Sequence, residues 1–184
     1  MRVVGGTLRG RALAAPSSDA VRPTTDRVRE ALFNVIAHAH PDALEGRVID
    51  LFAGTGALGI EALSRGCPSA LFVDSSAEGR GLLRRNVDAL GLGGRAKISR
   101  RDATALGALG RDEAFVLAFL DPPYGRELGE RAAASLVAGD WLAPGALLVL
   151  EEERGRVPDR LPGFERSDRR SFGGTDIGFF RRER

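Results

Sequence analysis

Hydrophobic and polar positions alternate in regular blocks through the central part of this 184-residue chain. Short apolar runs, typical of buried strands, are separated by longer segments in which apolar residues recur at helical spacing. Residues 77–90 have this spacing, with Leu82, Leu83 and Val87 on one face. Strands that alternate with helices predict right-handed βαβ units and a mainly parallel sheet. We expect strands at residues 48–51, 70–73, 96–99, 115–120 and 147–150, and further helices at 58–65 and 126–138.

The N-terminal part of the chain does not follow this alternation. Residues 2–13 contain two short strand-like runs around a Gly-Gly pair, which predict a small hairpin. Thr24 or Thr25 can cap a helix that ends before Pro41. We therefore expect residues 1–40 to form a hairpin and helix extension to the main domain.

The C-terminal part also departs from the alternation. Residues 164–172 and 177–180 flank another Gly-Gly pair and predict a closing antiparallel hairpin. With this hairpin included, residues 41–184 are expected to form one α/β domain.

Composition excludes several classes of protein. The chain is 43% hydrophobic, which excludes a wholly disordered protein, and no apolar run approaches the roughly 20 residues that a membrane span needs. Its N-terminus lacks the pattern of a signal or transit peptide. Cys67 is the single cysteine, and no Cys/His cluster has the spacing of a zinc site. We expect a cytoplasmic protein with no metal and no membrane contact.

The charge is distributed unevenly, although the net charge is only +2. Residues 1–29 carry +4, residues 30–153 carry −6, and residues 154–184 carry +4. Basic ends around an acidic middle are consistent with a polyanion that the ends hold. An arginine-rich proteome explains the same pattern, because all basic residues except Lys97 are arginine. Charge alone leaves both explanations open.

A glycine-rich turn follows the first expected strand. Gly54, Gly56 and Gly59 have the spacing of a nucleotide-binding turn, in which a ligand approaches the backbone and a helix N-terminus closely. Asp74 ends the second expected strand, where a carboxylate can bind both ribose hydroxyls of an adenosine. A nicotinamide dinucleotide remains possible on these residues alone.

Two further carboxylates favour a different cofactor. Asp50 precedes the glycines, where it suits a ligand amino group better than a pyrophosphate, and Asp102 follows the third expected strand. With Asp74, they match the methionyl amine, the ribose and the adenine of S-adenosylmethionine. Each aspartate alone is better explained as a helix cap or a turn residue, but three at successive strand ends are much harder to explain in that way. The predicted cofactor-binding residues are Asp50, Phe52, Gly54, Gly56, Asp74, Asp102 and Ala103.

The most specific motif is Asp121-Pro122-Pro123-Tyr124, which follows the most strongly apolar strand. The two prolines hold φ nearly fixed, so the chain leaves the sheet as a rigid extended segment. The Asp121 carboxylate and the Pro122 carbonyl could accept both protons of an exocyclic NH2 group. Tyr124 could stack on the base, a contact worth roughly 1–3 kcal/mol.

The same motif suggests a catalytic chemistry. The lone pair of an exocyclic amine is delocalised into its ring, and two acceptors can bias the nitrogen towards sp3 geometry and aim that lone pair at a sulfonium methyl. Alignment then supplies most of the catalysis, without a metal or a covalent enzyme intermediate. Asp121 or a water molecule would take the released proton. The predicted catalytic residues are Asp121, Pro122 and Tyr124.

The chain resembles the RsmD family, the bacterial 16S ribosomal RNA guanine-N2 methyltransferases, over nearly its whole length. The resemblance is carried by residues 9–11, by Arg-Pro-Thr-Thr-Asp and the helix after it at 22–34, by the glycine turn at 50–66, and by residues 121–124. Two departures are Asp74, where the family more often has Glu followed by an acid, and Phe172, where a turn of the family has Tyr.

This resemblance implies a class I methyltransferase Rossmann-like fold with a seven-stranded, mainly parallel sheet and an antiparallel C-terminal hairpin. It implies methyl transfer from S-adenosylmethionine to N2 of one guanine in an assembled or partly assembled small ribosomal subunit. Thr24 and Thr25 would then help to close the cofactor site, and nothing demands more than a monomer. The arginines expected to contact RNA phosphates are Arg9, Arg11, Arg22, Arg169 and Arg170.

Other functions fit parts of the same pattern. An adenine-N6 methyltransferase on DNA or another RNA would use the same motif, but 184 residues leave little room for a domain that reads duplex DNA. A protein-glutamine methyltransferase would normally have Asn-Pro-Pro-Tyr. A non-catalytic cofactor-binding RNA module is disfavoured by the intact motif at residues 121–124.

Overall fold

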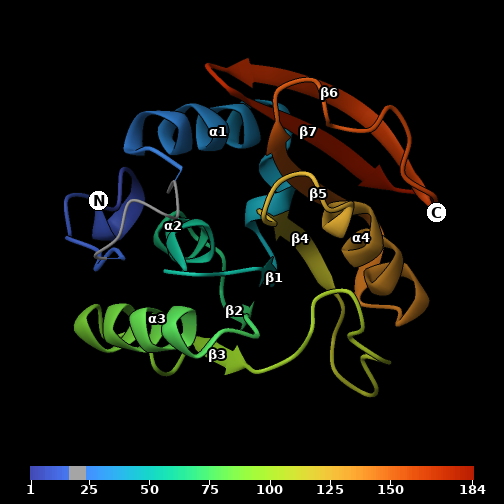
Figure 1. Ribbon diagram of the computed structural model, residues 1–184. Helices are drawn as coiled ribbons and strands as arrows, with labels where there is room; N and C mark the ends of the chain where they lie inside the picture. Colours follow the sequence, from blue (N-terminus) through green and yellow to red (C-terminus); the bar gives the residue numbers. More distant parts are fainter. Residues whose placement is uncertain (17–23) are drawn as a thin grey trace.

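The chain folds around one seven-stranded sheet. We describe a computed structural model of residues 1–16 and 24–184 (Figure 1). The strand order is β3-β2-β1-β4-β5-β7-β6, and β7 runs antiparallel to both of its neighbours while the other pairs are parallel. The fold class and the antiparallel C-terminal hairpin are therefore as predicted. The strands are β1 (Val48–Leu51), β2 (Ala70–Val73), β3 (Ala96–Ser99), β4 (Phe115–Leu120), β5 (Leu142–Glu153), β6 (Phe164–Phe172) and β7 (Thr175–Arg182).

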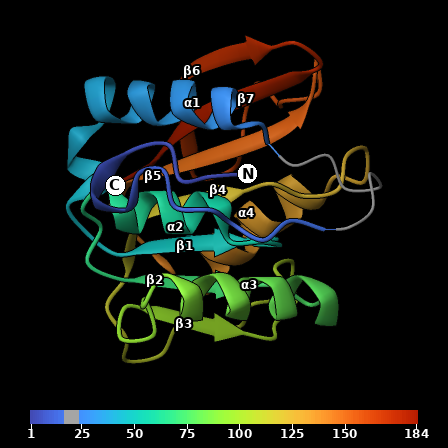
Figure 2. The ribbon, with the colours of Figure 1, turned by 90° about the vertical axis from the view of Figure 1, so that its left-hand side faces the viewer.

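Helices cover both faces of this sheet (Figures 1 and 2). The helices α1 (Asp26–Ala39), α2 (Ala57–Ser64) and α3 (Ala77–Ala89) lie on one face, and α4 (Leu128–Ala138) lies on the other. Because successive strand residues point to opposite faces, the sheet contributes to two hydrophobic cores. Within the described residues, no helix is long and apolar enough to cross a membrane.

The strand β5 extends further than the hydrophobic pattern indicates. The expected strand at 147–150 is the centre of β5, which continues through Glu151, Glu152 and Glu153 because these residues pair with the start of β7. In contrast, α4 begins at Leu128, two residues later than expected, after Glu127 with φ of 52°. Polar residues thus continue the strand, which places them at the edge where β4 also ends.

The N-terminal segment forms the predicted hairpin only in part. A single antiparallel bridge joins Arg2 to Ala12, and the short 3-10 helix η1 (Gly6–Leu8) occupies the turn between them. This arm lies across α2 (Figure 2), where the Ser64 hydroxyl donates to the Gly5 carbonyl at 2.6 Å. Gly6 must be glycine, because its φ is 74° and a Cβ would lie 1.9 Å from the Ser64 carbonyl oxygen.

The helix α1 joins this arm to the rest of the chain. The Thr25 hydroxyl caps it by accepting from the Val28 amide at 3.2 Å, as the sequence predicted. After α1, the short 3-10 helix η2 (Pro41–Leu44) leads into β1. Phe33 and Ile36 of α1 are fully buried in the same core as the α2 face of the sheet. The division of the chain at residue 40 stays a prediction.

Candidate active site

The predicted site residues meet at one edge of the sheet. In open α/β sheets, ligands bind beyond the carboxyl ends of the parallel strands. Asp50 lies near the end of β1, while Asp74, Asp102 and Asp121 follow β2, β3 and β4. Because β1 lies between β2 and β4, the cofactor carboxylates and the Asp-Pro-Pro-Tyr motif lie on adjacent strands.

The turn between β1 and α2 has the backbone that the glycines predicted. Gly54 and Gly56 have φ of 54° and 78°, and Phe52 adopts the same left-handed region with φ of 58°. A Cβ on Gly56 would lie 2.3 Å from Leu83, whereas the nearest atom to a Cβ on Gly54 is 3.9 Å away. Gly56 is thus required by packing, and Gly54 leaves open space at the sheet edge, where a ligand could approach. For Phe52, this conformation costs about 1–2 kcal/mol.

Asp50 is a buried carboxylate with no cation paired to it among the described residues. It is 2% exposed, and its Oδ2 accepts from the Gly59 amide at 2.9 Å. Burial raises the pKa of Asp50 to about 8; the Gly59 hydrogen bond opposes this and the nearby Asp74 adds to it. Within residues 1–16 and 24–184, no basic side chain forms an ion pair with Asp50. A ligand ammonium group would supply the missing positive charge.

Asp74 and Asp102 already hold the loops around them. Asp74 accepts from the Gly54 amide at 2.7 Å and from the Ser76 amide at 2.8 Å. Asp102 is exposed, and the Thr104 hydroxyl and amide both donate to its Oδ1, which lowers its pKa. Since an ionised carboxylate offers about four acceptor positions, each keeps capacity for a ligand hydroxyl or amine. The neighbouring Ala103 is buried.

The Asp-Pro-Pro-Tyr segment lies beside these residues. Pro122 is buried, and Tyr124 is 38% exposed, so its ring is accessible to a ligand. The Tyr124 hydroxyl lies 3.0 Å from the Thr175 Oγ1 at the start of β7. Burial raises the pKa of Tyr124 to about 12, so the hydroxyl is neutral at physiological pH. Burial also raises the pKa of Asp121, and the adjacent Glu151 adds to that effect.

Glu151 is the site residue that the sequence interpretation missed. Leu120 of β4 pairs with Leu150 of β5, so Asp121, which follows β4, and Glu151, which is still within β5, lie at the same level. Glu151 is 6% exposed and accepts from the Thr24 hydroxyl at 2.7 Å. A signal was available, because Glu151 follows the apolar run 147–150 just as Asp121 follows 115–120.

The two threonines that were predicted to help close the cofactor site make different contacts. Thr24 reaches the site through Glu151, while the Thr25 hydroxyl is engaged in the helix cap. Among residues 1–16 and 24–184, no group of three or more His, Cys, Asp or Glu residues could hold a metal ion.

The predicted RNA-contacting arginines fall into two groups. Arg9 and Arg11 are exposed on the N-terminal arm, and Arg11 donates to the Ala89 carbonyl at the end of α3. Arg169 and Arg170 are exposed on β6, where Arg170 pairs across the strands with Ile177. Because Ile177 also pairs with Glu151, Arg170 lies in the same cross-strand row as the site. Arg22 lies outside the described residues.

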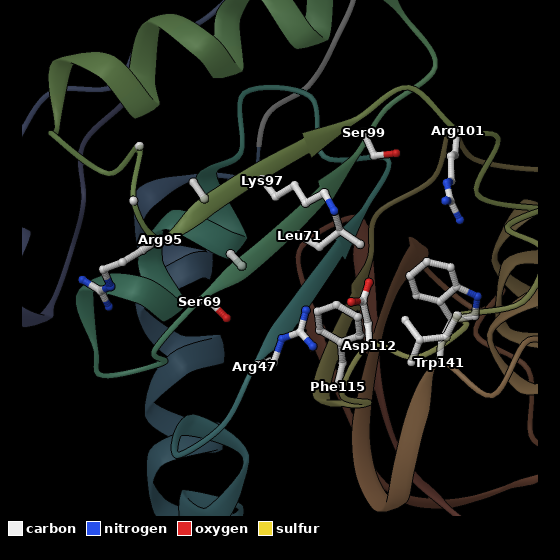
Figure 3. A pocket seen from close by; sticks show the side chains of 15 residues that line it. Arg47, Ser69, Leu71, Arg95, Lys97, Ser99, Arg101, Asp112, Phe115 and Trp141 are labelled. Carbon is white, nitrogen blue, oxygen red and sulfur yellow. The ribbon is translucent and has the colours of Figure 1, made fainter.

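A separate cavity of about 410 Å³ lies on the opposite face of β2 and β3 from α3 (Figure 3). None of the predicted site residues lines it. Leu71, on the strand face opposite Phe72, forms part of its wall, and the loop between β3 and β4 borders it. This cavity therefore does not belong to the candidate active site.

The geometry at the sheet edge defines a class of protein before any relative is considered. A mainly parallel sheet with an antiparallel β7, and with carboxylates and Asp-Pro-Pro-Tyr on adjacent strands, is the arrangement of a Rossmann-like methyltransferase. A solved Escherichia coli structure described as a candidate methyltransferase, yhhF, has the same fold: its TM-score is 0.83 at 34% identity, over 100% of this chain and 98% of that one.

Comparison of sequences identifies the family. A family model described as conserved hypothetical protein 95 matches residues 1–181, and the chain belongs to this family. Ribosomal RNA small subunit methyltransferase D of Escherichia coli K12 is 39% identical over 88% of this chain and 78% of its own length. The protein of the same name from Haemophilus influenzae is 34% identical over 85% and 80%. These relatives confirm the resemblance that the motifs predicted, and the chain is a methyltransferase.

Proposed function

We propose that this chain transfers a methyl group from S-adenosylmethionine to the exocyclic N2 amine of a guanine in 16S rRNA. The names of its relatives support a ribosomal RNA substrate. The observation that carries the proposal is the adjacency of β1 and β4, because Leu51 pairs with Leu120 and an amine-binding motif therefore lies beside the buried Asp50. The substrate would be an assembled or partly assembled small subunit, which the enzyme would bind as a monomer.

The residues present fit the cofactor. S-adenosylmethionine supplies an electrophilic methyl group on a sulfonium when it is bound. Asp50, which is buried and has no cationic partner in the part of the chain that the structure describes, suits the ammonium group of the methionyl part. Asp74 suits the ribose hydroxyls, and Asp102 with Ala103 suits the adenine. The turn at Phe52, Gly54 and Gly56 would hold these groups against the backbone.

The acceptor side would act by alignment. Asp121 and the Pro122 carbonyl would accept the two amine protons, which orients the nitrogen lone pair, and Tyr124 would stack on the base. The rigid exit of Asp121-Pro122 from β4 would fix these acceptors before the substrate binds, so little reorganisation is needed at the moment of transfer. No residue of this set is asked to bind a metal.

The segment before α1 would cover the site. Thr24 donates to Glu151, and its carbonyl accepts from Arg29 at 3.3 Å, so it is held between the sheet edge and α1. Thr24 and Thr25 would therefore limit access of water to the cofactor. The exposed arginines of the arm and of β6 would hold the RNA backbone on either side, with Arg22 between them in the sequence.

A methylation assay with several substrates tests the proposal. Radiolabelled S-adenosylmethionine is mixed with small subunits that lack the modification, with mature subunits, with free 16S rRNA and with duplex DNA. We expect label in the unmodified subunits and little in the mature ones, with N2-methylguanosine as the product in a nucleoside digest. N6-methyladenosine, or labelling of DNA alone, would contradict the proposal.

A further inference from the structure

The Asp121–Glu151 pair is built into the sheet. Because β4 and β5 are parallel and pair at Leu120 and Leu150, the next residue on each strand lies at the same edge. Neighbouring strands are about 4.8 Å apart, so two carboxyl groups share one small volume. Glu151 is 6% exposed, which gives it little access to solvent. A glutamate that is buried in this way adds little to the solubility of the protein, so its presence needs another explanation.

The contacts of Glu151 connect separate parts of the site. Thr24, from the segment before α1, donates to its Oε2 at 2.7 Å. The Tyr124 hydroxyl, from the turn after β4, lies 3.4 Å from its Oε1 and also contacts Thr175 of β7. Glu151 thus fixes both the residue expected to stack on the base and the segment expected to cover the cofactor.

Among residues 1–16 and 24–184, the charged groups that act on Asp121 are acidic. Asp50, on β1, and Glu152, on β5, lie close enough to Asp121 to raise its pKa, whereas a hydrogen bond from Thr24 lowers it. Tyr124 is neutral. Burial is the largest cause of the raised pKa of Asp121 and of Glu151, and Glu151 is the largest of the charges acting on Asp121. Within residues 1–16 and 24–184, no basic side chain forms an ion pair with either. Two adjacent carboxyl groups without a cation favour holding one proton between them.

Methyl transfer to an amine releases one proton, which this pair is suited to receive. The nitrogen lone pair forms the new N–C bond, and the S–C bond breaks with its electron pair left on sulfur. The positive charge moves to the nitrogen, which then loses a proton. We propose that Glu151 is a positioning residue that holds the Tyr124 and Thr24 hydroxyls and strengthens Asp121 as the acceptor of that proton. This inference rests on the proposed function.

Glu151→Gln tests the role of the charge, with Glu152→Gln as the matched control. Glu152 is 4% exposed on the same strand but points to the opposite face and does not contact Tyr124 or Thr24. Removing the negative charge at residue 151 should lower the pKa of Asp121, because it takes away a like-charged neighbour. The acid limb of the pH profile of methyl transfer should then move down by about one pH unit. Glu152→Gln should move it less.

Two further variants separate charge from position. Tyr124→Phe removes one hydrogen bond to Glu151 and keeps its charge, so kcat should fall several-fold with no shift of the acid limb. Thr24→Val also removes a hydrogen bond that lowers the pKa of Asp121, so it should move the acid limb up. Glu151→Asp keeps the negative charge, so the pH of its acid limb should lie between those of the wild type and of Glu151→Gln. An unshifted limb in a folded Glu151→Gln protein overturns the inference while wild-type activity upholds the proposed function. A wild type that methylates no RNA overturns the proposed function itself, and cofactor binding by calorimetry reports folding of each variant.

A different observation concerns the cavity on the far face of β2 and β3. Its lining includes Arg47, Lys97 and Arg101, with Asp112 as an acidic neighbour. No ion pair within the described chain includes these three basic residues. Figure 3 shows Arg47 and Arg101 directed toward the cavity, whereas Arg95 points away from it.

Aromatic residues fix the direction of two of these cations. The Arg47 guanidinium lies 4.4 Å from the ring centre of Phe115, and that of Arg101 lies 5.4 Å from Trp141. Each guanidinium also donates to one backbone carbonyl, and its other N–H groups stay available to a further acceptor. We infer that this cavity binds the phosphate backbone of single-stranded RNA, a contact additional to those of the arm and β6.

Salt-dependent binding of a short uridine oligonucleotide tests this second inference. The double variant Lys97→Gln/Arg101→Gln should weaken binding and reduce the salt slope by about 0.7 for each phosphate that the protein no longer neutralises. The control Arg84→Gln/Arg85→Gln removes two exposed charges from α3 on the opposite face. The single variant Lys97→Gln leaves the Arg101–Trp141 contact intact, so weaker binding by this variant is not explained by misfolding around Trp141. Equal effects in the test and control variants overturn the inference, as does weaker binding of ribosomal subunits with unchanged binding of RNA, which would point to a protein partner.

Discussion

Two groups of buried carboxylates in this molecule have opposite surroundings. Glu61 of α2 is fully buried and lies 2.8 Å from Arg65 and 3.7 Å from Arg29. It also accepts from the Val4 amide at 2.9 Å. At the sheet edge, Asp50 and Glu151 are almost as buried but accept only from neutral donors within the described residues.

The difference distinguishes a carboxylate that stabilises the fold from carboxylates that suit a reaction. The charge of Glu61 is compensated, so it connects the N-terminal arm to α1 and α2. An uncompensated buried carboxylate costs folding free energy, and such groups gather at functional sites, where the bound ligand or the reaction supplies the missing charge. The cationic cofactor and the released proton are the two positive charges that the proposed reaction brings to the sheet edge. Substitutions in the two groups should therefore have different consequences.

The largest expected effect is on activity at the sheet edge. Asp121→Ala removes the proposed acceptor of the amine and of its proton, so methyl transfer should fall by about a thousandfold or more. The affinity for S-adenosylmethionine should stay within severalfold, because the proposed role of Asp121 is toward the base. Single-turnover assays and calorimetry measure the two quantities. Retained turnover would rule out the role assigned to Asp121.

The next effect is on stability at the other group. Glu61→Gln removes one of the two carboxylates beside the fully buried Arg29 and leaves Asp26 at 2.9 Å, so the cost should lie below the about 3–5 kcal/mol of a completely broken buried pair. Urea unfolding should detect this loss, and Arg65→Gln should cost less because the Arg65 side chain is 15% exposed. A Glu61→Gln protein as stable as the wild type would show that the pair contributes little.

These two groups differ in how far the sequence could predict them. The strand ends at Asp50, Asp74 and Asp121 follow from short apolar runs and turn residues, which are local signals. The apolar run at 147–150 also places Glu151 at the sheet edge, but it does not predict the burial of Glu151, which depends on pairing of β5 with β7. The Arg29–Glu61 pair is likewise invisible, because each residue looks like an ordinary charge on its own helix and only packing brings the helices together.

A smaller effect is expected on the pH dependence of stability. Asp50 has a folded pKa of about 8 against an ordinary value of 3.8, so between these values the folded state binds the proton more tightly. Stability should therefore fall as pH rises through this window, by at most about 1.4 kcal/mol per pH unit. Asp50→Asn should reduce this slope between pH 6 and 7.5 in the absence of cofactor, as urea unfolding would show. An equal slope in both proteins would mean that Asp50 is ionised in the folded state.

The smallest expected effect concerns RNA binding by the basic residues near the sheet edge. Arg170 lies in the row Glu151–Ile177–Arg170, about 10 Å from Glu151 and on the same face of the sheet. Arg169 precedes it and points to the opposite face, so it is a matched control with the same charge. Arg170→Gln should reduce the salt slope of RNA binding by about one unit, and Arg169→Gln should reduce it less. Because Arg170 also pairs with Asp168 at 2.8 Å, part of its charge is already compensated, which limits the loss of affinity to a few-fold. Equal slopes for the two variants would mean that the position of the charge on β6 does not matter. RNA near the sheet edge would then be positioned by the arginines of the N-terminal arm alone.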